Sequence, residues 1–212
     1  MTIRTSTRRT RTRRAALAAV AVTAALALAA CGGSGDGGDH AAHGASASAS
    51  ASAARTHNAQ DVAFAQGMIP HHQQALEMAR LAAGRASSAR VKDLATRIEK
   101  AQDPEIRTMT GWLTSWGEQV PMAGMDHSGH SGMPGMPGMM TDADMTALKK
   151  AKGTDFDTKF LSMMVEHHQG AVEMAGTEKS KGSYGPAKTL ADAIVTAQNA
   201  EIKEMKKLLG AN

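Results

Sequence analysis

Two pairs of adjacent histidines, His71-His72 and His167-His168, are the residues of this 212-residue chain best suited to chemistry. Imidazole is a frequent metal ligand and the side chain that most readily exchanges a proton near neutral pH. Each pair sits in a segment otherwise rich in Ala and Met, without a nearby Cys or Ser in a nucleophile pattern. The pairs therefore indicate metal binding, and the elements that hold them decide between this and a purely structural role.

Both pairs belong to an internal repeat, the first feature to seek in such a chain. Residues 61–109 align without a gap with residues 157–205, at a constant offset of 96. The residues shared with the second segment include Asp61, Phe64, Met68, Met78, Leu94, Ile98, Gln102, Glu105, Ile106 and Met109. Identity at so many matched positions predicts a tandem duplication.

Each half has the spacing of a helical hairpin. Apolar residues and one His of each pair recur at steps of three and four, which places them on one helix face. Gly84 and the segment Gly182–Gly185 mark the turns. Two such hairpins must pack together to bury their faces, so the sequence predicts an all-α four-helix bundle. We also expect kinks or breaks at Pro70 and Pro104, and a short capped helix within Thr141–Lys152.

The interior of this bundle is the first candidate metal site. His71 and His167 fall on the apolar stripe, and His72 and His168 fall at its edge. Neighbouring residues of the same and facing helices add thioether and carboxylate candidates: Met68, Met78, Met164, Met174, Glu105 and Glu201. Such a lining can bind a metal ion, yet it equally describes core histidines satisfied by Glu, with Met filling space. The Glu-x-x-His motif of di-iron bundles is absent, which argues against that oxidase chemistry.

A second candidate site lies in the linker between the halves. Among Gly, Pro, Ser and Asp it carries Met122, Met125, His127, His130, Met133, Met136, Met139 and Met140. Apolar residues there have no helix stripe to occupy, so packing explains them poorly. Thioethers select Cu(I), and imidazole binds copper in either oxidation state. The linker therefore favours soft-metal binding, against the alternatives of a biased linker or an oxidant-scavenging Met tract.

The N-terminus has the pattern of an export signal. Six Arg precede an apolar stretch, Ala15–Ala30, that ends directly at Cys31. Small residues before a Cys match the bacterial lipobox, so we expect removal of residues 1–30 and lipidation of Cys31. Residues 31–56 then form a Gly/Ser/Ala tether, and the domain lies outside the cell membrane, anchored by lipid. Export by the general secretory or the twin-arginine route stays open.

Loss of this signal changes the charge argument. Of the 24 Lys and Arg residues, six leave with the signal, so 18 basic residues face 20 acidic ones. A net charge of −2 without a basic aromatic-lined stripe excludes nucleic acid as a predicted partner. Cys31 is also the single Cys, so disulfides and thiolate sites are excluded once it is acylated.

With these motifs in view, the chain resembles the bacterial family called domain of unknown function 305. The resemblance rests on Phe64…Met68…His71-His72…Met78-Ala79 and its copy around His167-His168, and covers about residues 57–210. It implies a ferritin-like four-helix fold in exported proteins, often lipoproteins, some of them linked to copper. We accordingly divide the domain into repeat 1 (57–117), a linker (118–141) and repeat 2 (142–210).

Three functional hypotheses follow. The first is a non-enzymatic envelope lipoprotein that sequesters or transfers copper or another soft ion such as silver, with Cu(I) favoured and no organic cofactor. The second is a metal-dependent redox enzyme of the envelope, for which the sequence supplies no nucleophile or cofactor fingerprint. The third is a structural or interaction module whose histidines are satisfied core residues.

Overall fold

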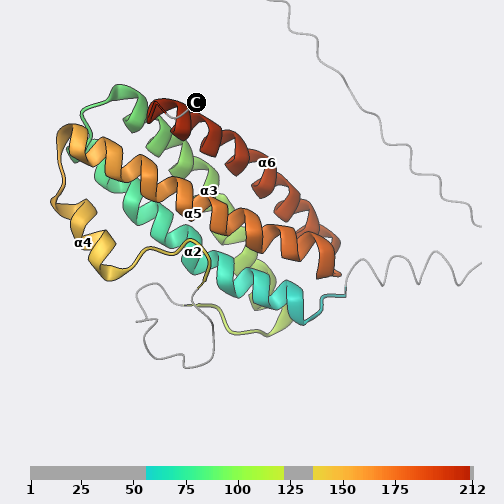
Figure 1. Ribbon diagram of the computed structural model, residues 1–212. Helices are drawn as coiled ribbons and strands as arrows, with labels where there is room; N and C mark the ends of the chain where they lie inside the picture. Colours follow the sequence, from blue (N-terminus) through green and yellow to red (C-terminus); the bar gives the residue numbers. More distant parts are fainter. Residues whose placement is uncertain (1–55, 122–135, 211–212) are drawn as a thin grey trace, which may run out of the picture. The chain divides into compact units, whose positions relative to one another are not determined.

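The computed structural model describes residues 56–121 and 136–210, which contain five helices (Figure 1). Four are long: α2 (Ala59–Arg85), α3 (Ala89–Trp116), α5 (Gly153–Lys181) and α6 (Gly185–Leu208). The short α4 spans Asp142–Lys150. The all-α class is confirmed. The predicted signal, lipidated Cys31, the tether, and Met122, Met125, His127, His130 and Met133 of the linker lie outside the described residues.

Local signals explain where the helices begin. Asn58 precedes α2 in a capping box, in which its side chain accepts from the backbone of Asp61 and Asp61 accepts from the backbone of Asn58. Thr141 and Asp144 form the same reciprocal pair at the start of α4. The short capped helix expected within residues 141–152 is therefore present. Pro186 occupies the first turn of α6, where its missing N–H costs nothing.

The helix breaks expected at Pro70 and Pro104 are absent. The two prolines lie inside α2 and α3, and each helix continues through its proline. A proline removes one hydrogen bond, and here long helices that pack along their whole length tolerate that local loss. Gly84 lies within the last turn of α2; the turn that follows is formed by Ala86, Ser87 and Ser88.

Each hairpin packs internally, α2 on α3 and α5 on α6, and the two hairpins meet where α2 lies against α5 (Figure 1). A matched pair of aspartates ties the hairpins together. Asp61 in α2 accepts from the backbone N–H of Tyr184 (2.9 Å) in the α5–α6 turn. Its counterpart Asp157 in α5 accepts from the backbone N–H of Ser88 (2.9 Å) in the α2–α3 turn. Each hairpin therefore caps the turn of the other.

The core consists of two apolar clusters with the histidine pairs between them. In α2, Phe64–Ile69 belong to one cluster, and Ala75–Ala86 contribute to the other. In α5 the order is reversed, because the helix runs in the opposite direction. The histidines thus occupy the polar middle of an otherwise apolar interior.

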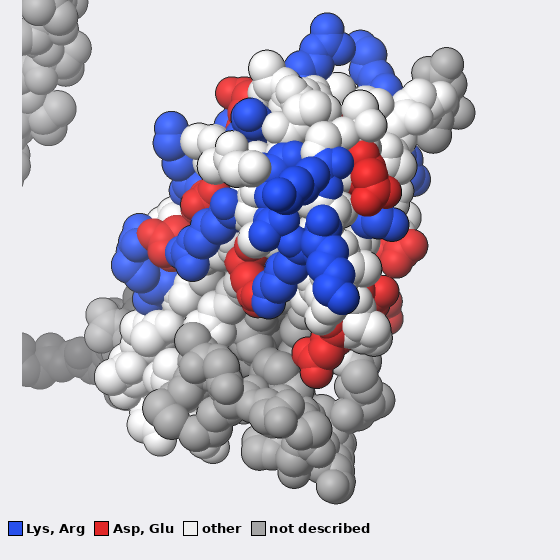
Figure 2. All heavy atoms as spheres, turned by 90° about the vertical axis from the view of Figure 1, so that its left-hand side faces the viewer, with Lys and Arg blue, Asp and Glu red and all other residues white. Residues whose placement is uncertain are grey.

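Lysines lie in the last turn of α4 (Lys149 and Lys150), of α5 (Lys179 and Lys181) and of α6 (Lys206 and Lys207), where they oppose the negative end of the helix dipole. Figure 2 shows Lys and Arg gathered on one face of the molecule, interspersed with Asp and Glu. Among the helices that the structure describes, none is both long and apolar enough to cross a membrane.

Candidate metal centre

All four paired histidines are buried, with exposed fractions of 0–1 %. The sequence placed His72 and His168 at the edge of the apolar stripe, yet they are as inaccessible as His71 and His167. The reason is tertiary: a helix of the same hairpin covers each of them. Both members of each pair therefore belong to the interior.

The outer member of each pair is held by a glutamate of the neighbouring helix. His72 Nε2 lies 2.7 Å from Glu105 Oε2, and His168 Nε2 lies 2.7 Å from Glu201 Oε2. A carboxylate accepts a hydrogen bond, so Nε2 of each ring carries a proton and donates it. Neither Nδ1 has a hydrogen-bond partner. A carboxylate behind a histidine whose other nitrogen is free is the arrangement that orients metal-binding histidines.

The inner members face one another across the hairpin interface. The ring centroids of His71 and His167 are 3.8 Å apart, with the planes inclined by 40°. His71 Nε2 lies 3.1 Å from the carbonyl oxygen of Pro137. Because a carbonyl can only accept, Nε2 of His71 is protonated and its Nδ1 is free. His167 has no hydrogen-bond partner at either ring nitrogen.

Burial makes these rings neutral. Desolvation, together with the neighbouring His72, lowers the pKa of His71 to about 3. Desolvation and the nearby His71 likewise hold the pKa of His167 well below its ordinary value of 6.5. Neutral imidazole is the form that binds metal, so both rings are ready to coordinate at neutral pH without first losing a proton.

Unpaired polar atoms are concentrated at this place. Ten buried side-chain nitrogen and oxygen atoms of the described residues have no hydrogen-bond partner, and eight of them belong to the four histidines, Gln102 and Gln198. Each such atom costs about 1–3 kcal/mol relative to a satisfied one. Sequence reasoning did not select Gln102 and Gln198 as site residues. Their recurrence at the repeat offset was the available signal.

Thioethers surround the histidines unevenly. Met136 Sδ and Met174 Sδ both lie over Gly67, 3.8 and 3.7 Å from where a Cβ on that residue would stand. Gly67 precedes His71 by one helical turn. Met68 and Met164 are fully buried beside the pairs in sequence, and Met78 lies in the apolar cluster that follows His72. Two sulfurs from different segments therefore meet one turn from the stacked rings.

The end of the linker reaches the bundle. Met136 to Met139 form a turn with Pro137 second, Gly138 third at φ 77°, and a hydrogen bond from Met139 N to Met136 O (3.2 Å). These are the features of a type II turn. The following residue, Met140, is bonded to Gln74 of α2. We call Met136–Met140 the strap. The linker and interior candidates, treated separately in the sequence, therefore meet at His71.

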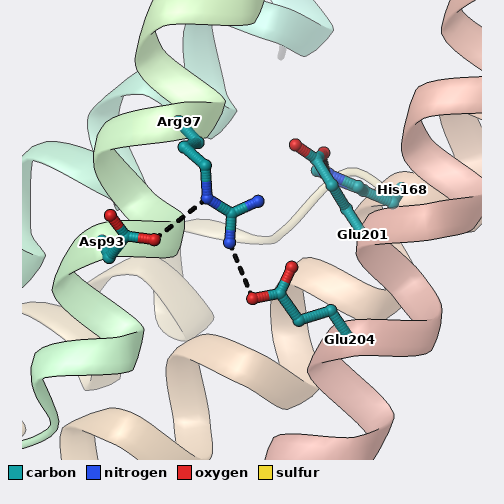
Figure 3. A network of polar contacts seen from close by, with 5 residues as sticks. All are labelled: Asp93, Arg97, His168, Glu201 and Glu204. Atoms are coloured by element: carbon teal, nitrogen blue, oxygen red, sulfur yellow. Dashed lines mark hydrogen bonds and ion pairs between the residues drawn. The ribbon is translucent and has the colours of Figure 1, made fainter. Parts of the chain in front are cut away.

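A surface ion pair lies just outside His168 and Glu201. Arg97 of α3 contacts Asp93 of its own helix and Glu204 of α6, the latter at 2.6 Å (Figure 3). These two carboxylates raise the pKa of Arg97. Glu204 is three residues from Glu201, so this pair braces the part of α6 that carries the His168 partner.

The donor set is soft. Among residues 56–121 and 136–210, no three or more His, Cys, Asp or Glu side chains come together so that they could hold a metal ion. Facing imidazoles with thioethers nearby suit a soft ion better than Zn²⁺ or iron. Fold and site together define a helical protein whose described residues form five helices, with a buried histidine centre at the junction of two hairpins.

The chain belongs to the family described as domain of unknown function (DUF305), whose model matches residues 61–209. A DUF305 protein of Streptomyces coelicolor, described as a candidate secreted protein, is 35% identical at a TM-score of 0.64, covering 71% of this chain and 92% of that one.

CopM in its Cu(II)-bound form is 36% identical at a TM-score of 0.61, covering 71% of this chain and 95% of that one. CopM in its Cu(I)-bound form is 34% identical at a TM-score of 0.57, with 70% and 94% covered. CopM was also solved with Ag bound. No curated protein sequence matches this chain.

Proposed function

We propose that this protein binds a soft metal ion, Cu(I) foremost, between its two hairpins, with His71 and His167 as the central ligands. One observation carries the proposal: the ring centroids of two buried imidazoles lie 3.8 Å apart while three of their four ring nitrogens have no partner. A core built for stability alone satisfies or replaces such groups. A metal ion bound there uses the lone pairs that the protein leaves free.

The charge of the site favours a monovalent ion. The central rings are neutral, and burying a cation is costly unless negative charge lies near. Glu105 and Glu201 supply it one hydrogen bond away, through His72 and His168. Met136 and Met174 add thioethers, the donors that prefer Cu(I) over Cu(II). The other predicted interior ligands, Met68, Met78 and Met164, complete the soft surroundings.

The relatives support the same assignment. CopM was solved with Cu(I), Cu(II) and Ag, at 34–36% identity over most of its length. Silver in place of copper is the behaviour of a thioether and imidazole site, since Ag shares the softness of Cu(I).

The setting is an envelope lipoprotein that sequesters copper or passes it on. Lipidated Cys31 anchors the chain, residues 31–56 act as the tether, and the linker methionines and histidines capture the ion before the centre binds it. We propose that the domain itself arose by tandem duplication of a helical hairpin and has ferritin-like four-helix architecture, with α4 as an addition. The reciprocal Asp61 and Asp157 caps support that origin.

The test is an anaerobic Cu(I) titration of residues 32–212 against a chromophoric chelator. Variant His71→Leu/His167→Leu removes the centre, and a second variant replaces the linker methionines by Leu. His57→Ala is the matched control, because His57 stacks on Trp116 away from the centre. We expect weakened binding in both variants and unchanged binding in the control. Absence of competition by the unaltered chain would leave the interaction-module hypothesis in its place.

A further inference from the structure

The two repeats differ at a position just after the histidine pairs. Gln74 follows His72 by two residues, and Gly170 follows His168 by two, so they are counterparts at the offset of 96. The residues directly beside them agree: His-His-Gln precedes both and Ala follows both. A difference between these identical neighbours calls for a physical reason, and both residues contact the strap.

On α2, Gln74 holds the strap by its amide. Gln74 Oε1 accepts from the backbone N–H of Met140 at 2.8 Å, and Gln74 Nε2 donates to the carbonyl of the same residue at 2.9 Å. Two bonds to the backbone of one residue fix both the position and the orientation of the strap's end. Gln73, the neighbouring and likewise half-buried amide, makes no hydrogen bond to the strap.

On α5, Gly170 makes room for the other end of the strap. A Cβ on Gly170 would overlap the carbonyl of Pro137 and stand 2.8 Å from Gly138 Cα. Gly138 lies equally close to α5: a Cβ added to it would stand 2.6 Å from the carbonyl oxygen of Glu166 and 2.9 Å from that of His167. Backbone therefore lies directly on backbone, which only glycine on both sides permits.

This seating has a chemical consequence for His71. It presents the Pro137 carbonyl 3.1 Å from His71 Nε2, which fixes the proton on that nitrogen and leaves Nδ1 free. Glu105 and Glu201 impose the same tautomer on His72 and His168. A histidine whose tautomer is fixed by the partner of its other nitrogen is a better-oriented ligand.

We propose that Gln74 and Gly170 are positioning residues that together seat the strap, so that Pro137 selects the Nε2-protonated tautomer of His71 and Met136 is delivered beside Met174. This difference between the two halves thus lets one linker lie asymmetrically across a symmetric pair of helices. The effect on metal affinity rests on the proposed function, whereas the seating and the tautomer are properties of the metal-free protein.

The first experiment uses the metal-free protein. Hydrogen exchange of the Met140 amide is compared in Gln74→Ala, in the matched control Gln73→Ala and in the unaltered chain. We expect exchange at least about tenfold faster in Gln74→Ala alone, because the N–H loses its acceptor. Equal exchange in all three proteins would overturn the role of Gln74.

The second readout is the tautomer of His71, from nitrogen-15 correlation spectra of the imidazoles. A substitution that only lowers the stability of the fold does not change this tautomer. Gly170→Ala displaces Pro137 and is compared with Gly176→Ala, since a Cβ on Gly176 meets nothing within 4 Å. We expect a mixed His71 tautomer in Gly170→Ala and an unchanged one in Gly176→Ala. A retained Nε2-protonated form in Gly170→Ala would overturn the selection by Pro137.

The third measurement is Cu(I) affinity by chelator competition. We expect it to fall by about tenfold or more in Gln74→Ala and Gly170→Ala, the usual cost of losing a group that orients a ligand. Unchanged affinity with a loosened strap would overturn the coupling to the centre. If the unaltered chain fails to bind Cu(I), the proposed function fails, and the exchange and tautomer results still decide the seating.

Discussion

Replacing His167 by Leu separates the stability of the fold from its function. His167 is 1 % exposed and has two ring nitrogens without partners. Leu has a similar size, fits between the two apolar clusters and needs no hydrogen bond. We therefore expect His167→Leu to stabilise the metal-free protein while it weakens Cu(I) binding.

The magnitude follows from the unpaired nitrogens. A buried polar atom without a partner costs about 1–3 kcal/mol, and loss of part of the ring's packing offsets some of that gain. We expect the free energy of unfolding at pH 7 to rise by about 1–3 kcal/mol. For a domain of this size that corresponds to roughly 2–4 °C in Tm for each kcal/mol.

The matched control is His168→Leu at the adjacent buried position. His168 is bonded to Glu201 at 2.7 Å, so its loss leaves a partly buried carboxylate without its donor. We expect His168→Leu to lower the free energy of unfolding by about 1–3 kcal/mol. Two neighbouring, equally buried His→Leu changes should therefore have opposite signs.

The assay is urea denaturation at pH 7 with a chelator present, so that bound metal does not stabilise the folded state. Cu(I) competition is measured on the same samples. Destabilisation of both variants by the same amount would refute the reasoning, because it would mean that His167 is satisfied as fully as His168.

Three further predictions concern other parts of the domain. Burial and the adjacent Asp61 raise the pKa of Glu178 from its ordinary 4.5 to about 8, so the folded protein holds a proton that the unfolded chain has lost, and stability falls as pH rises through that window. We expect the urea midpoint of unfolding to drop more from pH 5 to pH 8 in the unaltered chain than in Glu178→Gln. Parallel pH curves for the two proteins would contradict this prediction. Asp157→Ala leaves two turn N–H groups without their acceptor and should cost about 2–4 kcal/mol by urea denaturation, against a change within about 0.5 kcal/mol for exposed Asp155→Ala. Arg97→Ala removes only exposed ion pairs, so it should lower the free energy of unfolding by less than about 1 kcal/mol, and by less still at 1 M salt. A larger loss, or one that salt does not change, would show that Arg97 stabilises the domain by packing and not by its ion pairs.

The sequence by itself determined the helices and the family. Steps of three and four fixed the helical face that carries His71, the capping residues at Thr141 and Asp144 fixed the start of α4, and the motif around the histidine pairs identified DUF305. These features are local or are repeated along the chain, so one-dimensional spacing contains them. No helix break occurs at Pro70 or Pro104, because the packing of a whole helix outweighs the local cost of one proline.

Only the tertiary structure decided which histidine meets which partner. Glu105 binds His72 rather than His71, and His71 instead lies against the ring of His167 and donates to Pro137. Helical periodicity gives the face on which a residue lies. It does not give the rotation and translation of one helix against the next, and a shift of one turn would exchange these partners. The strap depends still more on the fold, because its seat is formed by residues from both hairpins that no sequence spacing brings together.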